Sequence, residues 1–520
     1  MQEESKPKGL IEVCRQIMLP FRSVAILLAL LFAYFVTMIL ALVLPPRKWR
    51  RPLRQYANVY SELLGTRFRY FREGGNLDEE FFTVFLPSRI HGDDERNPAS
   101  FQARARSYVY RVKRNIARKN YQTVLQRIRK KEKPIEVLLV SSGSAKWCVQ
   151  SLYDALENDP RFNVKVVTIL RKTHGINYQK TYDFFEQRGM NVVHGYDRNH
   201  NGILDLSIFS PDIVFLPEPW LGDIKYAPLH ISQYALACYV PYSFMLFRGI
   251  DRQYRRPFHN ELWKYFCPTP IHLQMAQKAA EDKGENVVVT GYPKMDFFLK
   301  KPNDKDTHPS VAPSGGQRKK RIIWAPHWTV TGNIGGNDVG TFMTYAEAFY
   351  LYCKETPEID FILKPHPNLW HSVVKEKLLS AEELESWLAR WNALPNATVM
   401  DEGNYFDLFA GSDAMILDSG SFIAEYTYTQ KPMLYLCKYK DTLAETTFND
   451  FGKKAIKHLY QAHCWEDVVR FIDDVVVQGN DPLCEQRIRF VNDVLKWTDK
   501  PACELIIDYL ASQLQLDSTC

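Results

Sequence analysis

The chain of 520 residues lacks the short motifs that most often mark metal, redox or nucleotide sites. Its ten cysteines are scattered and form no Cys-x-x-Cys pair, which argues against a zinc site or a thioredoxin-like motif and suits a reducing compartment. Neither a Gly-Lys-Ser/Thr phosphate loop nor a Gly-x-Gly-x-x-Gly turn is present. With 46% hydrophobic and 24% charged residues, the chain has the composition of a globular protein, and its length predicts two or three domains.

The net charge of +6 conceals a strong asymmetry along the chain. Residues 1–133 hold 26 Lys and Arg against 12 Asp and Glu, whereas the remainder holds 40 against 48. The basic excess is therefore entirely N-terminal. Nucleic-acid binding by the globular part is not predicted.

Residues 23–45 form the predicted transmembrane anchor, and residues 23–44 carry no charge. A helix of that length spans about 33 Å, enough for a bilayer core of ~30 Å. Pro45 and Pro46 follow in place of a signal-peptide cleavage site, so we expect an uncleaved, single-pass helix. The basic run RKWRRPLR comes next, which predicts that the catalytic part faces the cytoplasm at the inner (cytoplasmic) membrane, with residues 1–22 as the tail on the far side. The alternative is a buried core helix.

Residues 46–133 are interpreted as a basic juxtamembrane region. Within it, residues 102–133 carry twelve Lys and Arg against a single acid, Glu132, and their apolar residues recur at helical spacing. Such a helix can lie on anionic lipid, hold an anionic polymer, or present a solvated face. We expect contact with membrane lipids here and through residues 23–45.

From residue 134 short apolar runs alternate with helical patterns, which predicts the α/β class with mainly parallel, covered sheets. An N-terminal Rossmann-like domain is expected over 134–300, and a linker rich in Pro, Gly and charge over 301–320. A second Rossmann-like domain is expected over 321–520, closed by three C-terminal helices. The expected strands include 135–142, 164–170, 211–219, 262–269, 287–293, 321–327, 359–365, 414–419 and 432–437. Two doubly wound domains place a ligand crevice between them, outside the strand ends.

Polar residues follow three predicted strands of the second half. His327 follows the first strand, and Lys364 and His366 follow the second, where two prolines flank the histidine. The third strand leads into the turn Asp418-Ser419-Gly420-Ser421, with Glu425 one helical turn further on. Taken alone, the segment around His366 is equally explained by a plain turn, and the turn at 418–421 is better explained by a plain capped turn. Together they predict one crevice edge, where histidine can exchange a proton, lysine can neutralise phosphate and a helix start can face an anion.

The same segments resemble a known family. WAPHWT (324–329), FILKPHP (361–367) and the stretch 405–436 are similar, in that order, to the C-terminal half of CDP-glycerol glycerophosphotransferases of the teichoic acid and capsule polymerase type. GYPKMDFF (291–298) resembles that family's Gly-x-Pro-x-x-Asp segment, and residues 141–162 resemble the N-terminal domain of capsule-type relatives. The resemblance covers about residues 135–440.

The resemblance implies a GT-B fold with a cytidine nucleotide in the second domain, and no metal or other cofactor. It implies transfer of a polyol phosphate from a CDP-activated donor to a hydroxyl of an anionic polymer or lipid-linked acceptor, with CMP leaving. His366 and Lys364 would contact the diphosphate and stabilise the leaving CMP. The other substrate-binding residues that it implies follow the third strand: Asp418, Ser419, Gly420, Ser421 and Glu425.

The general base is the least defined part of this interpretation. Typical members carry a Trp-His-Gly motif in the first domain, but here YALACYVPYSF (234–244) occupies roughly that region. His327 is therefore the first candidate for the base and His230 the second. Two other functions fit the same fold: a glycosyltransferase that uses a CMP- or UDP-sugar in capsule synthesis, and a non-catalytic scaffold. The sequence does not choose among donors, acceptors or oligomeric states.

Overall fold

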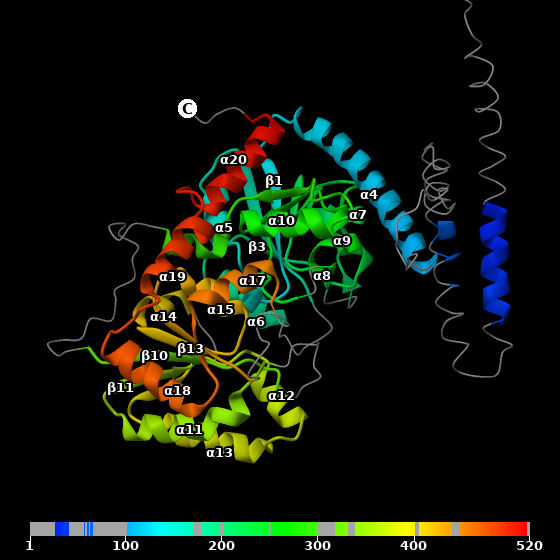
Figure 1. Ribbon diagram of the computed structural model, residues 1–520. Helices are drawn as coiled ribbons and strands as arrows, with labels where there is room; N and C mark the ends of the chain where they lie inside the picture. The colour runs from blue at the N-terminus through cyan, green and yellow to red at the C-terminus, as the bar shows by residue number, and fades with distance from the viewer. Residues whose placement is uncertain are drawn as a thin grey trace, which may run out of the picture.

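The computed structural model shows two lobes joined edge to edge, with a separate N-terminal helix (Figure 1). The structure describes residues 27–40, 57, 60–61, 63–65, 101–170, 178–197, 202–248, 251–299, 318–330, 339–400, 405–438 and 448–516. The predicted tail 1–22 and most of the predicted linker 301–320 lie outside the described residues.

The first lobe is built on a seven-stranded parallel sheet in the order β3-β2-β1-β6-β7-β8-β9. Its strands are β1 (Ile135–Ser141), β2 (Phe162–Thr168), β3 (Val192–His194), β6 (Ile213–Leu216), β7 (Leu236–Tyr239), β8 (Lys264–Cys267) and β9 (Val287–Val289). The helices of this lobe are α5 (Gln150–Glu157), α6 (Tyr178–Glu186), α7 (Pro228–Ile231), α8 (Asp251–Tyr254), α9 (Pro257–Glu261) and α10 (Pro270–Ala279). A short hairpin, β4 (Tyr196–Asp197) and β5 (Gly202–Ile203), lies outside the sheet.

The second lobe contains a six-stranded parallel sheet in the order β12-β11-β10-β13-β14-β15. Its strands are β10 (Lys320–Ala325), β11 (Ile359–Leu363), β12 (Ala397–Val399), β13 (Ala414–Leu417), β14 (Met433–Leu436) and β15 (Tyr460–Ala462). The helices are α11 (Phe342–Glu355), α12 (Leu369–Lys375), α13 (Ala381–Asn392), α14 (Tyr405–Gly411), α15 (Ser421–Thr427), α17 (Asp450–Ala455) and α18 (Trp465–Arg470). The predicted α/β class with two Rossmann-like halves is confirmed.

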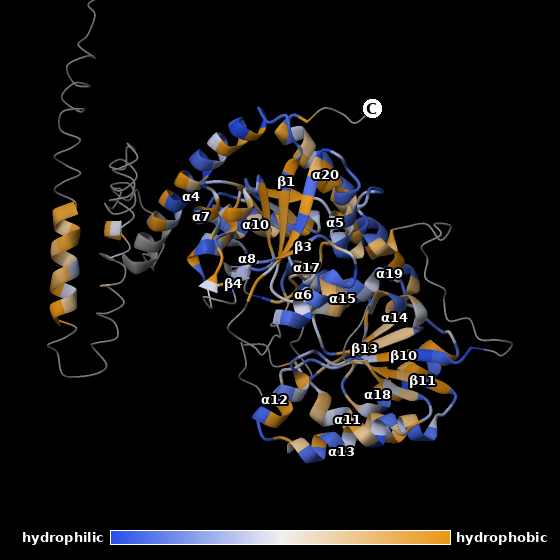
Figure 2. Cartoon of the chain, turned by 180° about the vertical axis from the view of Figure 1, so that it is seen from behind, coloured by the Kyte–Doolittle hydropathy of each residue, from blue (hydrophilic) through white to orange (hydrophobic). Residues whose placement is uncertain are grey.

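Alternate residues of the second sheet enter different apolar clusters. Ile322 and Trp324 of β10 pack with α11 and α13, whereas Ile323 and Ala325 belong to a cluster that continues into the first lobe. Because both faces are covered, the strands are apolar without alternation, as the hydropathy colouring shows (Figure 2). The shared cluster gives the two lobes one continuous apolar contact.

The basic helix α4 (Phe101–Ile128) packs on the first lobe through its apolar face. Val112, Ile116 and Val124 are buried in the main cluster, and the Tyr121 hydroxyl donates to the Glu261 carbonyl at 2.7 Å. An apolar stripe that is covered by protein is not available to lipid, so the expectation that this face lies on the membrane is corrected. The first domain includes α4 and begins before the predicted boundary at 134.

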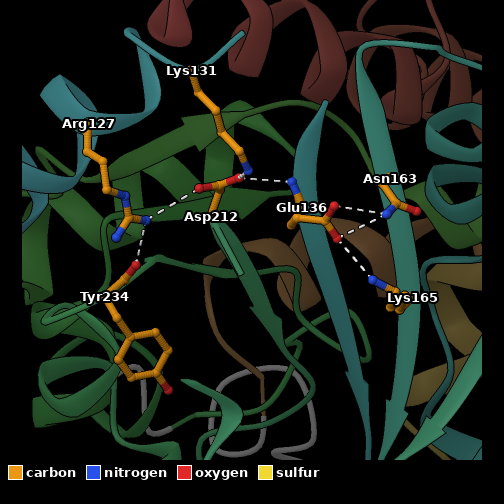
Figure 3. Close-up of polar contacts among 7 residues, drawn as sticks. All are labelled: Arg127, Lys131, Glu136, Asn163, Lys165, Asp212 and Tyr234. Carbon is orange, nitrogen blue, oxygen red and sulfur yellow. Dashed lines mark hydrogen bonds and ion pairs between the residues drawn. The ribbon is translucent and has the colours of Figure 1, made fainter. Parts of the chain in front are cut away.

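Two basic residues at the end of this segment pair with an acid of the first sheet (Figure 3). Arg127 and Lys131 both form ion pairs with Asp212, which lies one residue before β6 and is almost fully buried. Asp212 also accepts the backbone N–H of Glu136 at 3.0 Å. These contacts fix α4 at the amino-terminal edge of the sheet, and they account for part of the basic run without an external anion.

The C-terminal helices divide between the lobes, although all three were expected in the second domain. α18 and the following π-helical turn (Phe471–Val477) cover the second sheet, but α20 (Ala502–Leu514) returns to the first lobe and packs on α5 (Figure 1). α19 (Cys484–Phe490) leads into this return. The start of α20 is bound by the segment 291–298, where Asp296 accepts the backbone N–H groups of Ala502 at 2.8 Å and Cys503 at 3.0 Å.

Residues 27–40 form a helix whose larger apolar side chains are mostly exposed. It is coloured as hydrophobic for most of its length, unlike α4 (Figure 2). The rest of the predicted anchor, residues 23–26 and 41–45, lies outside the described residues. Within the described part of the chain, no helix combines the length and the apolar character that crossing a membrane requires.

We expect Asp296→Ala to destabilise the protein, because it leaves two buried N–H groups at the start of α20, those of Ala502 and Cys503, without their acceptor. The loss in unfolding free energy should be about 1–3 kcal/mol, measured by urea denaturation of the full chain in detergent. Asp508→Ala removes an exposed carboxylate of the same helix and should cost less than about 0.5 kcal/mol. Equal effects of the two substitutions would contradict the capping role.

Candidate active site

The three polar segments of the second half follow neighbouring strands. β11, β10 and β13 are adjacent in the sheet, so the residues after Leu363, Ala325 and Leu417 meet at one carboxyl edge. The structure therefore brings His327, Lys364, His366 and Asp418 together, as their spacing predicts.

The two prolines around His366 leave only two backbone donors in the KPHP segment, and both are used. The N–H of Lys364 donates to the Trp324 carbonyl at 2.8 Å, and the N–H of His366 donates to the Pro326 carbonyl at 3.0 Å. These bonds continue the β10–β11 ladder past the end of both strands. The imidazole of His366 is thereby fixed beside that of His327, with ring centroids 5.4 Å apart.

Asp418 connects the segment after β10 to the residue before α11. Its carboxylate accepts the backbone N–H of His327 at 2.5 Å, and the backbone N–H and hydroxyl of Thr341, the residue before α11. Asp418 is fully buried, and burial raises its pKa to about 6 although these hydrogen bonds oppose the rise. Both carboxylate oxygens are thus engaged by the protein. Asp418 positions the site, whereas the sequence assigned it to the wall of the substrate pocket.

The hydrogen bonds of His366 and His327 fix their tautomers. The backbone N–H of Asn368 donates to Nδ1 of His366 at 3.1 Å, so the neutral ring carries its proton on Nε2. Nδ1 of His327 lies 2.9 Å from the Thr329 hydroxyl. That hydroxyl oxygen accepts the N–H of Gly340, and its own hydrogen is therefore directed to Nδ1. Both histidines present an Nε2–H donor.

Both imidazoles are neutral at pH 7. Burial, and then the neighbouring His366, lowers the pKa of His327 to about 3. Burial, and then the neighbouring Lys364, lowers the pKa of His366 to about 4. A neutral N–H donor suits the oxygens of a diphosphate. It does not offer the lone pair that a general base needs, so this geometry does not favour His327 as the base.

His230, the second candidate for the base, lies elsewhere. It is on α7, shortly before β7 begins, and its Nε2 pairs with Asp205 at 2.6 Å. Its ring also contacts Tyr234, in the same lobe. These contacts all lie within the first lobe, so the structure does not join His230 to the histidine pair.

The remaining predicted residues lie where the lobes touch. A Cβ atom on Gly420 would come within 2.5 Å of the Phe247 ring of the first lobe, so any side chain here would displace that ring. Buried Glu425 accepts from Lys294 of the first lobe at 3.3 Å and from the Tyr405 hydroxyl at 2.8 Å. Ser419 is buried, and Ser421 begins α15, a helix of seven residues; the side chain of Ser421 lies outside the described part.

These contacts also orient the two sheets. Phe247 follows β7, and Gly420 follows β13, so the carboxyl edge of one sheet faces that of the other. Asn449 reinforces the contact, because its backbone N–H donates to the Leu246 carbonyl at 2.8 Å. The edge that carries the histidines is therefore turned toward the first lobe.

Sequence reasoning missed a second polar cluster, at the carboxyl edge of the first sheet. Ser142 and Lys146 follow β1, and Glu218 follows the adjacent β6. Glu218 accepts from both the Ser142 hydroxyl and the Lys146 ammonium. The signal was available, because SSGS and PEP are polar segments directly after apolar strands, as in the second half.

The fold and site define a two-domain α/β protein with a polar edge suited to a diphosphate. Residues 253–512, half of the chain, match the family model described as CDP-glycerol:poly(glycerophosphate) glycerophosphotransferase. The chain belongs to this family, and it is a CDP-glycerol glycerophosphotransferase-like enzyme. A search of curated proteins found no match.

Solved structures give weaker similarities. The wall teichoic acid polymerase TagF aligns at 15% identity with a TM-score of 0.47, over 79% of this chain and 95% of that one. A putative UDP-N-acetylglucosamine 2-epimerase from Listeria monocytogenes aligns at 14% identity with a TM-score of 0.48, over 74% of this chain and 98% of that one. Similarities this weak have no bearing on function.

Acid should destabilise the protein through its buried histidines. Buried His327 and partly buried His366 are joined by three further buried histidines, His259, His272 and His458, whose pKa values burial lowers to about 3. Because the unfolded chain binds these protons below about pH 6.5 and the folded chain does not, stability should fall as the pH drops from about 6.5 toward 4. Asp418 acts in the opposite direction, because its raised pKa makes the folded chain bind a proton first.

Urea denaturation at pH 7.5, 6 and 5 measures this slope, which can reach at most about 1.4 kcal/mol per pH unit for each histidine. His366→Gln should reduce the slope, whereas substitution of exposed His371 should leave it unchanged. An unfolding free energy that is constant between pH 7.5 and 5 would contradict the neutral, buried state of these rings.

Proposed function

We propose that the protein is a membrane-anchored, cytoplasm-facing transferase of cell-envelope polymer synthesis. It moves glycerol phosphate from CDP-glycerol to a hydroxyl of an anionic polymer or lipid-linked acceptor, and CMP leaves. The family match over residues 253–512 is the observation that carries this proposal. The donor edge of His327, Lys364 and His366 supports it, because these groups suit a diphosphate.

In this reaction the acceptor hydroxyl attacks the β-phosphorus of the donor. The bond from that phosphorus to the oxygen of CMP breaks, and negative charge develops on the leaving group. The Nε2–H groups of His366 and His327 would donate to the diphosphate oxygens, and Lys364 would supply positive charge. Asp418 fixes the His327 segment against the residue before α11, and the Pro326 carbonyl accepts the N–H of His366.

Membrane anchoring rests on residues 23–45 and the basic run that follows them. Leu30 of the N-terminal helix and Leu63 belong to the same apolar cluster as Val109 and Val112 of α4. This shared cluster supports an anchor that lies beside the first lobe. A lipid-linked acceptor would then lie within reach of the active site.

His366→Ala should lower kcat for CMP release from CDP-glycerol by about 10²–10³-fold, because it removes one donor to the leaving diphosphate. The full chain in detergent is incubated with CDP-glycerol and a synthetic glycerol phosphate oligomer, and CMP is quantified. His371→Ala, an exposed histidine on α12, is the matched control and should leave kcat within about twofold.

Parallel reactions with CDP-ribitol, CMP-sugars and UDP-sugars test the choice of donor. The proposed donor is wrong if one of these is turned over and CDP-glycerol is not. The site assignment is wrong if His366→Ala retains full activity while its melting temperature is unchanged.

The anchor predicts that the full chain sediments with membranes and is released by detergent but not by alkaline carbonate. Phe32→Lys combined with Phe35→Lys places two charges within the apolar helix and should release a large part of the protein, since each charge at a bilayer centre costs about 3 kcal/mol. Lys113→Glu combined with Lys119→Glu on α4 changes surface charge outside the anchor and should not. Carbonate extraction of the unaltered chain would contradict a spanning anchor.

A further inference from the structure

Lys146 and Glu218 form an ion pair at the carboxyl edge of the first sheet, outside the site described in the second lobe. The Glu218 side chain is fully buried, whereas the Lys146 side chain is one-quarter exposed. Glu218 also accepts the hydroxyl of buried Ser142 at 2.6 Å. The carboxylate is thus fixed within the protein, and the ammonium is the part of the cluster that reaches the surface.

A buried carboxylate is costly, and removing its partner leaves the cost uncompensated. The ion pair therefore restricts the Lys146 ammonium to one position. A lysine without such a partner samples many positions, because its side chain is flexible. A pocket of about 20 Å³, enough for one water-sized group, lies beside it. Gly143, Trp147, Pro217 and Val240 line this pocket together with Lys146.

This cluster lies on the side of the first lobe that faces the donor edge. The Lys146 ammonium stands 5.3 Å from the centroid of the Tyr242 ring, in the loop after β7. The same loop carries Phe247, which touches Gly420, two residues beyond Asp418. The pocket and the histidine pair thus lie at the carboxyl edges of the two sheets, which face each other.

The transfer of a phosphoryl group leaves a role for a cation at the carboxyl edge of the first sheet. His327 and His366 are neutral donors, so on the donor edge described above Lys364 is the cationic side chain. The transferred phosphoryl group carries charge on its non-bridging oxygens, and the acceptor approaches in line from the side opposite the leaving CMP. A fixed ammonium on that side stabilises the charge without reorganisation.

We propose that Lys146 is a catalytic residue on the acceptor side, and that Glu218 is the positioning residue that orients it; this inference rests on the proposed glycerol phosphate transfer. The ammonium contacts a non-bridging oxygen of the phosphoryl group as the acceptor oxygen bonds to the β-phosphorus. The electrons of the broken bond leave with CMP, and Lys146 keeps its protons. In a loose transition state the acceptor hydroxyl loses its proton late, to water.

Lys146→Ala in the full chain should lower kcat for CMP release by about 10²–10³-fold and change KM for CDP-glycerol by less than about threefold. Lys165→Ala is the matched control. Lys165 pairs with Glu136 at 3.0 Å in the same sheet, and its side chain is 28% exposed, but the pair lies toward the amino ends of the strands (Figure 3). It should leave kcat within about twofold.

Rescue by methylammonium distinguishes a catalytic role of Lys146 from a purely structural one. Added at millimolar concentration, it should restore Lys146→Ala activity at least tenfold, as the missing cation enters the space beside Glu218. Rescue should be lost in Lys146→Ala combined with Glu218→Gln, because the neutral amide no longer attracts the cation. Urea denaturation verifies that each variant is folded.

The outcomes separate this inference from the function on which it rests. If the unaltered chain turns over CDP-glycerol but Lys146→Ala matches Lys165→Ala, or if methylammonium has no effect on a folded Lys146→Ala, the inference is overturned and the proposed function stands. If the unaltered chain releases no CMP from CDP-glycerol, the proposed function fails, and the inference fails with it.

Discussion

The buried carboxylate of Asp418 is the constraint on which the donor edge depends. It ties the segment after β10 to the start of α11 through the N–H groups of His327 and Thr341. Because the carboxylate is fully buried, losing a partner would leave unpaired charge in the interior. The protein therefore keeps this turn in one conformation, and the imidazole of His327 remains beside that of His366.

Buried contacts also fix the two lobes relative to each other. The Lys294–Glu425 pair is buried, and Gly420 admits the ring of Phe247 where any side chain would collide. α20 returns to the first lobe, where Asp296 caps it. These contacts hold the two carboxyl edges face to face. A transfer reaction benefits from such fixation, because correct placement of two reactants removes a large part of the entropic barrier.

The sequence predicted the donor edge better than the first lobe. Apolar runs that end in His327, Lys364 and Asp418 gave a clear pattern, and parallel strands bring such ends together. The strand β7 was not predicted, although at four residues it is as long as β6, which was. The polar ends that carry Lys146 and Glu218 gave the same kind of signal, but the sequence does not specify that these two side chains pair.

Residue type and order alone determined the α/β class, the polar strand ends and the apolar segment 23–45, because each depends on local composition and period. Only the tertiary structure decided that α4 and α20 belong to the first lobe, since that depends on which apolar faces meet. It also decided the state of the histidines. Their tautomers and lowered pKa values come from burial and from partners on other turns, which the sequence does not specify.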